Sequence, residues 1–106
     1  MARGEIHLND IGTIFEVIVK DQDDNVVDIS SATGAHAKLI IFKKPDATKV
    51  EKDTIFSTDG KDGKMRYVTV DGDLNLLGDW EYQGKVILTA GTWSSDIYTF
   101  RVYRNL

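Results

Sequence analysis

The sequence predicts an all-β fold of about seven or eight antiparallel strands that form a two-sheet sandwich. Three observations support this prediction. Apolar and polar residues alternate in short runs, the pattern of strands with one buried face. Turn residues separate these runs at intervals of roughly 8 to 12 residues, the spacing of sandwiches and small barrels. No stretch has the periodicity of a helix, and no long connection indicates an α/β crossover.

Length and composition indicate one globular domain. The chain has 106 residues, about the modal size of a domain, so we expect residues 1–106 to fold as a single unit. Hydrophobic residues make up 42% and charged residues 28% of the chain, a balance that supports a packed core rather than disorder. The absence of cysteine excludes disulfides, thiolate nucleophiles and the common cysteine-based zinc sites.

Charge and hydropathy restrict the classes of partner that this chain is expected to bind. The formal net charge of −4 opposes binding to nucleic acid, because phosphate contacts require an excess of lysine and arginine. No apolar run approaches the roughly 18 residues that span a bilayer, and the first five residues lack the apolar segment of a secretory signal. We therefore expect no nucleic-acid partner, no membrane partner, and synthesis in a cytoplasm.

The first strand is expected over residues 13–20, where apolar residues at every second position share one face. Ile14 and Ile18 lie on the other face and predict that it is partly covered. Five polar residues at 21–25 favour a turn, because their side chains bond to nearby backbone. Residues 26–29 are then expected to return as a short strand.

The segment 37–43 contains four consecutive apolar residues, which is typical of a central strand covered on both faces. A turn at Pro45 leads into residues 49–56, a more polar strand expected nearer an edge. The lysines of this region are expected to solvate the hairpin and protect the edge from pairing, with an anion-binding patch as the alternative. They are Lys43, Lys44, Lys49 and Lys52.

The second half of the chain predicts three more strands. Two Asp-Gly pairs at 59–63 mark a reversal, and a strand is expected over residues 65–70. A turn at 71–73 precedes a long strand at 79–88. The last strand is expected at 95–103, and its short link to the preceding strand predicts an antiparallel hairpin at the centre of one sheet.

The residues offer no motif for catalysis, a metal or a cofactor, so we expect none of the three. Asp21 and Asp71 each begin an Asp-x-Asp-x-Asn run that resembles a calcium loop, but both runs lack the glycine and glutamate that such a loop requires. They are interpreted as turns, with a loose surface calcium site as the alternative. His7 and His36 have no second ligand at metal-binding spacing. No serine lies in a nucleophile motif.

Aromatic residues are the best candidates for contact with a partner. Trp80 and Tyr82 share the apolar face of their strand and are expected in the core. Trp93 lies beside the predicted hairpin turn, where it either caps the end of the sandwich or makes an exposed contact. We select Trp93 as the first candidate contact, followed by Tyr98 and Tyr103.

The order of six short motifs resembles the immunoglobulin-like domains of tailed-phage structural proteins, in particular the amino-terminal domain of the phage baseplate upper protein family. The motifs are 9–13 (NDIGT), 19–23 (VKDQD), 25–33 (NVVDISSAT), 40–46 (IIFKKPD), 59–67 (DGKDGKMRY) and 78–84 (GDWEYQG). The resemblance covers nearly the whole chain and implies an immunoglobulin-like β-sandwich. Baseplate upper proteins continue into a carboxyl-terminal region that carries the fibre, and this chain does not contain that region.

The resemblance implies a virion structural protein that performs no catalysis. Such domains dock on a tail or baseplate and hold other virion proteins such as fibres, often in several copies. We expect this adaptor role, a location in the virion after synthesis in the bacterial host cytoplasm, and oligomeric assembly. The alternative is a particle-decorating or carbohydrate-binding module that grips host glycans through Trp93 and nearby loops.

Overall fold

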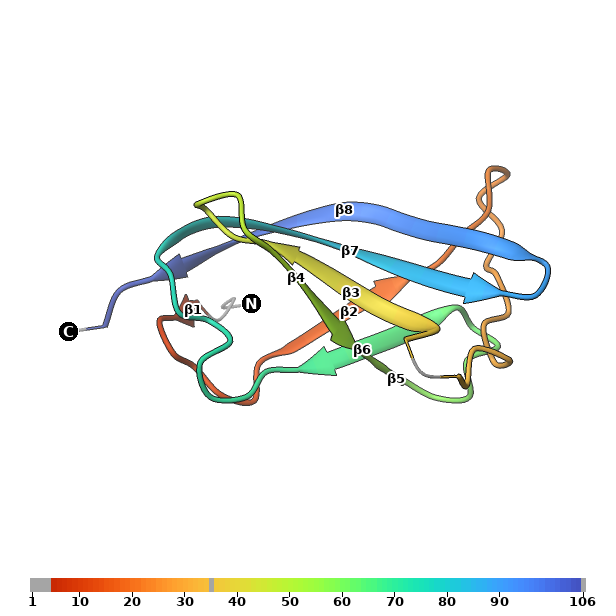
Figure 1. Ribbon diagram of the computed structural model, residues 1–106, viewed down its shortest axis with the longest axis horizontal. Coiled ribbons are helices and arrows are strands. Elements are labelled where there is room, and N and C mark those ends of the chain that lie inside the picture. The colour runs from red at the N-terminus through yellow and green to blue at the C-terminus, as the bar shows by residue number, and fades with distance from the viewer. Residues whose placement is uncertain (1–4, 35, 106) are drawn as a thin grey trace.

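The computed structural model describes residues 5–34 and 36–105, and within these ranges the chain is all-β, with eight strands and no helix (Figure 1). The prediction of an all-β fold is confirmed. No helix in the described ranges is long and apolar enough to cross a membrane. The strands are β1 (Ile6–His7), β2 (Ile14–Ile18), β3 (Lys38–Lys43), β4 (Lys49–Asp53), β5 (Ile55–Phe56), β6 (Lys64–Val68), β7 (Gly78–Leu88) and β8 (Gly91–Tyr103).

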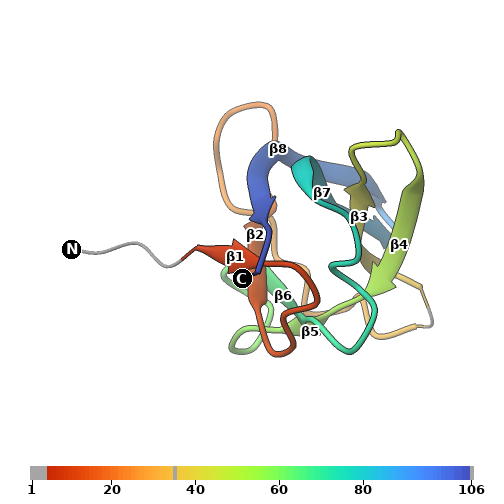
Figure 2. The ribbon, with the colours of Figure 1, turned by 90° about the vertical axis from the view of Figure 1, so that its left-hand side faces the viewer.

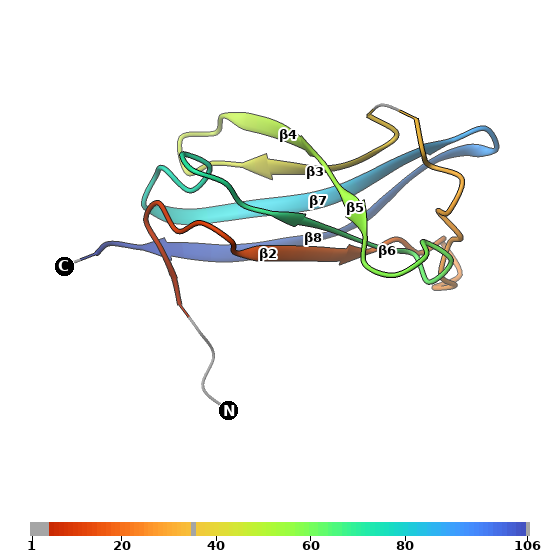
Figure 3. The same cartoon turned by 90° about the horizontal axis from the view of Figure 1, so that it is seen from below.

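The strands form a five-stranded sheet, in the order β1-β8-β7-β3-β4, and a three-stranded sheet, in the order β2-β6-β5. The three-stranded sheet lies in front of the five-stranded sheet when the molecule is seen from below (Figure 3). The predicted hairpin is confirmed as β7 and β8, inside the larger sheet, and β3 is central, between β7 and β4. The prediction that all strands are antiparallel is wrong, because β1 pairs in parallel with the end of β8. Two residues suffice for that pairing, too few to produce a recognisable alternation in the sequence.

Alternating side chains from both sheets meet in one core. Phe15 of β2 packs against three rings of the facing sheet, with ring centroids 5.2 Å from Phe42, 5.1 Å from Tyr82 and 4.6 Å from Phe100. Trp80 is 2% exposed and stacks on Phe100. Each such buried side chain contributes about 1.5–3 kcal/mol, and the core fixes which face of each strand points inward.

The strand predicted at 26–29 does not form. The structure has only an isolated bridge between Lys20 and Val26. The amide of Val27 donates to Val19 O and that of Ile29 donates to Gly60 O, so the backbone bonds go to two separate loops rather than to one strand. Ile29 is fully buried, which explains the apolar pattern without a strand.

The strand predicted at 49–56 divides between the two sheets. β4 pairs with β3 in the larger sheet, and β5 pairs with β6 in the smaller one. Thr54 lies between them, 6% exposed, and its amide and hydroxyl both donate to Lys38 O, at 3.2 and 3.1 Å. This anchored crossing closes one side of the molecule, while β2 and β8 lie on the opposite side (Figure 2).

Candidate interaction surface

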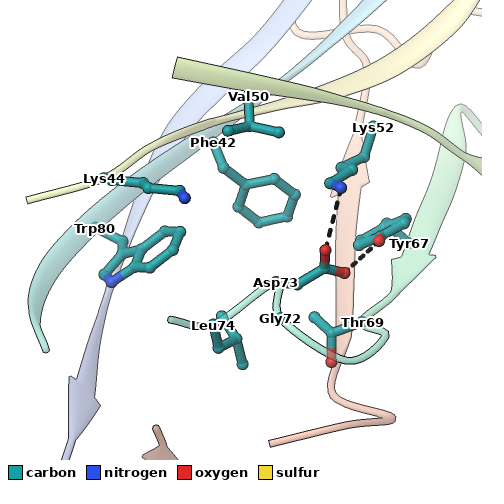
Figure 4. A pocket seen from close by; sticks show the side chains of 10 residues that line it. All are labelled: Phe42, Lys44, Val50, Lys52, Tyr67, Thr69, Gly72, Asp73, Leu74 and Trp80. Atoms are coloured by element: carbon teal, nitrogen blue, oxygen red, sulfur yellow. Dashed lines mark hydrogen bonds and ion pairs between the residues drawn. The ribbon is translucent and has the colours of Figure 1, made fainter. Parts of the chain in front are cut away.

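A small cavity lies between the sheets on the closed side (Figure 4). Its volume is about 70 Å³. Asp73 is its hub: Oδ2 accepts the hydroxyl of Tyr67 and the amide of Val70 (2.8 Å), and Oδ1 lies 3.1 Å from the Lys52 ammonium. The lining residues are Phe42, Lys44, Val50, Lys52, Tyr67, Thr69, Gly72, Asp73, Leu74 and Trp80.

The two acidic groups of the cavity are held in opposite protonation states. Burial alone would raise the pKa of Asp73, but the bonds from Tyr67, Val70 and Lys52 outweigh burial and lower it below its ordinary value. Burial, with the hydrogen bond and charge of Asp73, raises the pKa of Tyr67 well above its ordinary value. A carboxylate and a neutral phenol therefore persist across physiological pH.

This arrangement commits the carboxylate of Asp73 to contacts that join the two sheets. All three acceptor contacts of Asp73 are to the protein itself, and the cavity has room for only a few water molecules. The sequence predicts only that Asp73 belongs to the turn at 71–73. No local signal identifies its partners, because Lys52 and Tyr67 come from strands of different sheets.

The four lysines of the predicted hairpin do not form one patch. Lys43 and Lys49 face each other across β3 and β4, and Lys43 pairs with Glu81 at 3.8 Å on the outer face. Lys44 instead lines the inner cavity and donates to Asn75 Oδ1 at 3.0 Å. The set is therefore split between two faces, which disfavours an anion site built from all four.

The first calcium-like run is an Asp-stabilised turn: Asp21 Oδ1 accepts the amides of Asp23 (2.9 Å) and Asn25 (3.0 Å). In the second run, Asp73 is bound to Tyr67 and Lys52 as above. Within residues 5–34 and 36–105, no three His, Cys, Asp or Glu residues are placed to hold a metal ion.

Two of the three predicted contact residues lie at opposite ends of β8. Trp93 belongs to β8, because that strand begins at Gly91; it is paired with Val86 and is half-buried. Tyr103 is 41% exposed, with its ring centroid 6.2 Å from that of His7. Ten residues of extended chain separate them by roughly 30 Å. They do not form one site.

Tyr98, the third candidate, lies on the open side of the molecule. Its ring stacks on Tyr82 with a centroid distance of 5.2 Å. Tyr98 also lines a recess of about 140 Å³ between β8 and the carboxyl end of β2. The recess is lined by Ile18, Lys20, Asp21, Asp24, Ser94, Ser95, Asp96 and Tyr98.

The strand beside this recess, β2, has an unpaired edge. Its register with β6 continues beyond both ends of the strand: the amide of Thr69 donates to Thr13 O, and the amide of Val19 donates to Gly63 O. Because bonded pairs alternate in an antiparallel ladder, odd-numbered residues of β2 bond to β6. The amides and carbonyls of Ile14, Glu16 and Ile18 therefore point away from the sheet. We call these groups the β2 edge.

The outer face of the three-stranded sheet carries exposed apolar side chains. Ile14 is 56% exposed and lies opposite Val68, which is 39% exposed. Val70 and Ile55 are both 55% exposed; Val70 follows on the same face, and Ile55 lies diagonal to Val68. The prediction that the second face of β2 is partly covered therefore fails at Ile14. We call Ile14, Ile55, Val68 and Val70 the outer apolar strip.

Acidic side chains surround the β2 edge. Asp21, Asp24 and Asp96 line the recess, and Glu16 lies within β2 itself. Lys20, the one cation of the recess, pairs with Asp24 at 3.5 Å. Three carboxylates against one ammonium give the recess a negative potential, whereas Glu16 lies opposite Arg66 on the outer face.

Comparisons with protein-family models, with curated proteins and with solved structures find no match.

Proposed function

We propose that this chain is a non-catalytic structural component of a bacteriophage virion, an adaptor of the tail or baseplate that docks other virion proteins such as fibres. The resemblance of six ordered motifs to baseplate upper proteins is the basis for the viral setting. The open β2 edge, flanked by the outer apolar strip, is the observation that carries the docking role.

The strand order supports an immunoglobulin-like fold within this proposal. Immunoglobulin domains place strands B, E and D in one sheet and C, F and G in the other. Assigning β2, β3, β5, β6, β7 and β8 to B, C, D, E, F and G reproduces that division. β1 is then an added strand beside G, and β4 an added strand beside C. The disulfide of antibody domains has no counterpart, because the chain lacks cysteine.

The absence of catalysis in the proposal agrees with how the largely buried carboxylate of Asp73 is used. Asp73 is committed to Tyr67, Val70 and Lys52. A general acid or base instead needs a free position facing a substrate.

The carbohydrate-binding alternative receives no support from the two tryptophans. Sugar stacking needs an exposed aromatic face, but Trp80 is 2% exposed and Trp93 is half-buried. A titration with host-surface glycans, followed by tryptophan fluorescence, is expected to give no saturable quenching. Saturable quenching would favour the carbohydrate-binding reading over the adaptor.

The decisive experiment asks whether this chain is present in purified phage particles. Phage particles purified by density gradient and analysed by quantitative mass spectrometry should contain this chain in a fixed ratio to the tail proteins. Particles stripped of their tails serve as the control and should lose it. A chain found only in cells without phage or prophage would contradict the proposal.

A further inference from the structure

The edges of the two sheets differ in how well they resist pairing with another chain. β4 carries four charged residues in five and is thereby protected. β1 and β5 have only two residues each. β2 has five, contains no proline and carries the single charge of Glu16. β8 is open from Gly91 to Arg101, a longer edge than that of β2, but the register shift opposite Gly84 interrupts its alternation and makes it a poorer template for a regular ladder.

We infer that the β2 edge binds an extended segment of another protein, which adds as a fourth strand to the three-stranded sheet and carries lysine or arginine between apolar residues. This inference rests on the proposed function, because the segment belongs to a neighbouring virion protein. Ile14, Glu16 and Ile18 supply unpaired donors and acceptors for the new ladder.

The side chains around the edge specify the chemistry of the added strand. Its outward residues would lie beside Ile14, at the margin of the outer apolar strip, and gain apolar contact there. Its inward residues would face the recess, where Asp96 and Tyr98 offer a carboxylate and a ring face to a cation. On the outer face, Arg66 lies directly opposite Glu16 and Lys64 lies opposite Ile18, so the negative potential belongs to the recess side, which the inward residues of the added strand would face.

Charge favours another protein over a second copy of this chain. In an antiparallel pairing of two β2 edges centred near Glu16, the two Glu16 side chains would project from the same face, opposite or diagonal to each other. Like charges at these positions are destabilising, and each chain carries a net charge of −4. A partner strand with apolar outward residues removes this repulsion, and its inward cations face the carboxylate of Asp96.

The test uses the full chain and a synthetic peptide of eight residues that alternates valine with lysine. On titration, the amides of Ile14, Glu16 and Ile18 should shift in NMR spectra, and their hydrogen exchange should slow at least about tenfold at saturation. Phe15 and Val17, whose amides already bond to β6, are the internal control and should change little. A twin peptide with glutamate in place of lysine should bind at least about tenfold more weakly at low salt.

Two methylated peptides test strand addition without altering the protein. Successive amides of a strand point to opposite edges. N-methylation of one alternate set should therefore abolish binding, and methylation of the other set should leave it. The protein variant Glu16→Pro should also block binding, while Glu16→Thr, which keeps the amide, should not.

Several results would overturn the inference. They are no saturable shifts at millimolar peptide, equal binding of both methylated peptides, equal binding of the acidic twin, or exchange protection that maps to β4 or β8. Concentration-dependent dimerisation that protects Ile14, Glu16 and Ile18 would make a second copy the occupant instead. If the chain is absent from particles, the proposed function fails; if it is present but the peptide does not bind, only this inference fails.

Discussion

Replacing Asp73 by alanine tests whether the cavity hub holds the two sheets together. The carboxylate joins Lys52 of the larger sheet to Tyr67 of the smaller one, and also bonds to the amide of Val70 in its own turn. Its side chain is 11% exposed, so solvent replaces these contacts poorly.

The magnitude follows from the three contacts. A hydrogen bond to a charged acceptor contributes about 1.5–3 kcal/mol, which we assign to Tyr67. The Lys52 side chain is 31% exposed, so its ion pair adds only about 0.5 kcal/mol. The Val70 bond contributes about 1 kcal/mol, partly recovered by water. Asp73→Ala should therefore lower the free energy of unfolding by about 2–4 kcal/mol.

The assay is urea unfolding of wild type, Asp73→Ala and the exposed neighbour Asp71→Ala, which should change stability by less than about 0.5 kcal/mol. The pKa of Asp73 is lowered in the folded state, so its contribution is complete above the ordinary aspartate pKa of about 4. The contribution is lost as pH falls through the lowered value. The difference in free energy of unfolding between wild type and Asp73→Ala should decrease over that range. A difference below about 1 kcal/mol at neutral pH, or one that stays the same in acid, would refute the reasoning.

Three further predictions concern the core beneath β7 and β8. A Cβ on Gly84 would lie 2.5 Å from Val17 Cγ2, so Gly84→Ala should destabilise by about 1–3 kcal/mol in urea unfolding, whereas Gly34→Ala, with open space around it, should be near neutral. Ser95→Ala leaves the buried amide of Gly84 without its 2.8 Å acceptor and should cost about 1–3 kcal/mol, while Ser94→Ala should cost little. Combining Gly84→Ala with Ser95→Ala should give a non-additive loss, measurable in a double-mutant cycle, because the two residues are in contact.

The sequence predicts the long strands well because packing and alternation agree there. Trp80, Tyr82, Gly84 and Val86 lie on the face that alternation assigns to the core, and all are buried or half-buried. The position of Trp93 was harder to predict. Because of the bulge opposite Gly84, the next inward-facing residue after Ser95 is Tyr98 rather than Ile97. A single period-two alternation therefore does not continue along the whole of β8.

Other features depend on contacts distant in sequence. The pattern of 49–56 continues through Thr54, and only the bonds from Thr54 to Lys38 O mark the crossing between sheets. The partners of Asp73 are likewise set by the packing of two sheets. Local propensity contains no information about either, so both were missed.

The exposed apolar residues of the outer strip connect the sequence pattern to the proposed docking role. Alternation places Ile14 on the solvent face of β2, where a polar residue would be expected, and the rest of the chain leaves it 56% exposed. Val68 directly opposite repeats the exception. Two apolar residues paired on a solvent face add only a small cross-strand contact to the isolated domain and raise its risk of aggregation. A strand bound at the β2 edge would shield Ile14, so the cover that the sequence predicts for this face would come from a partner.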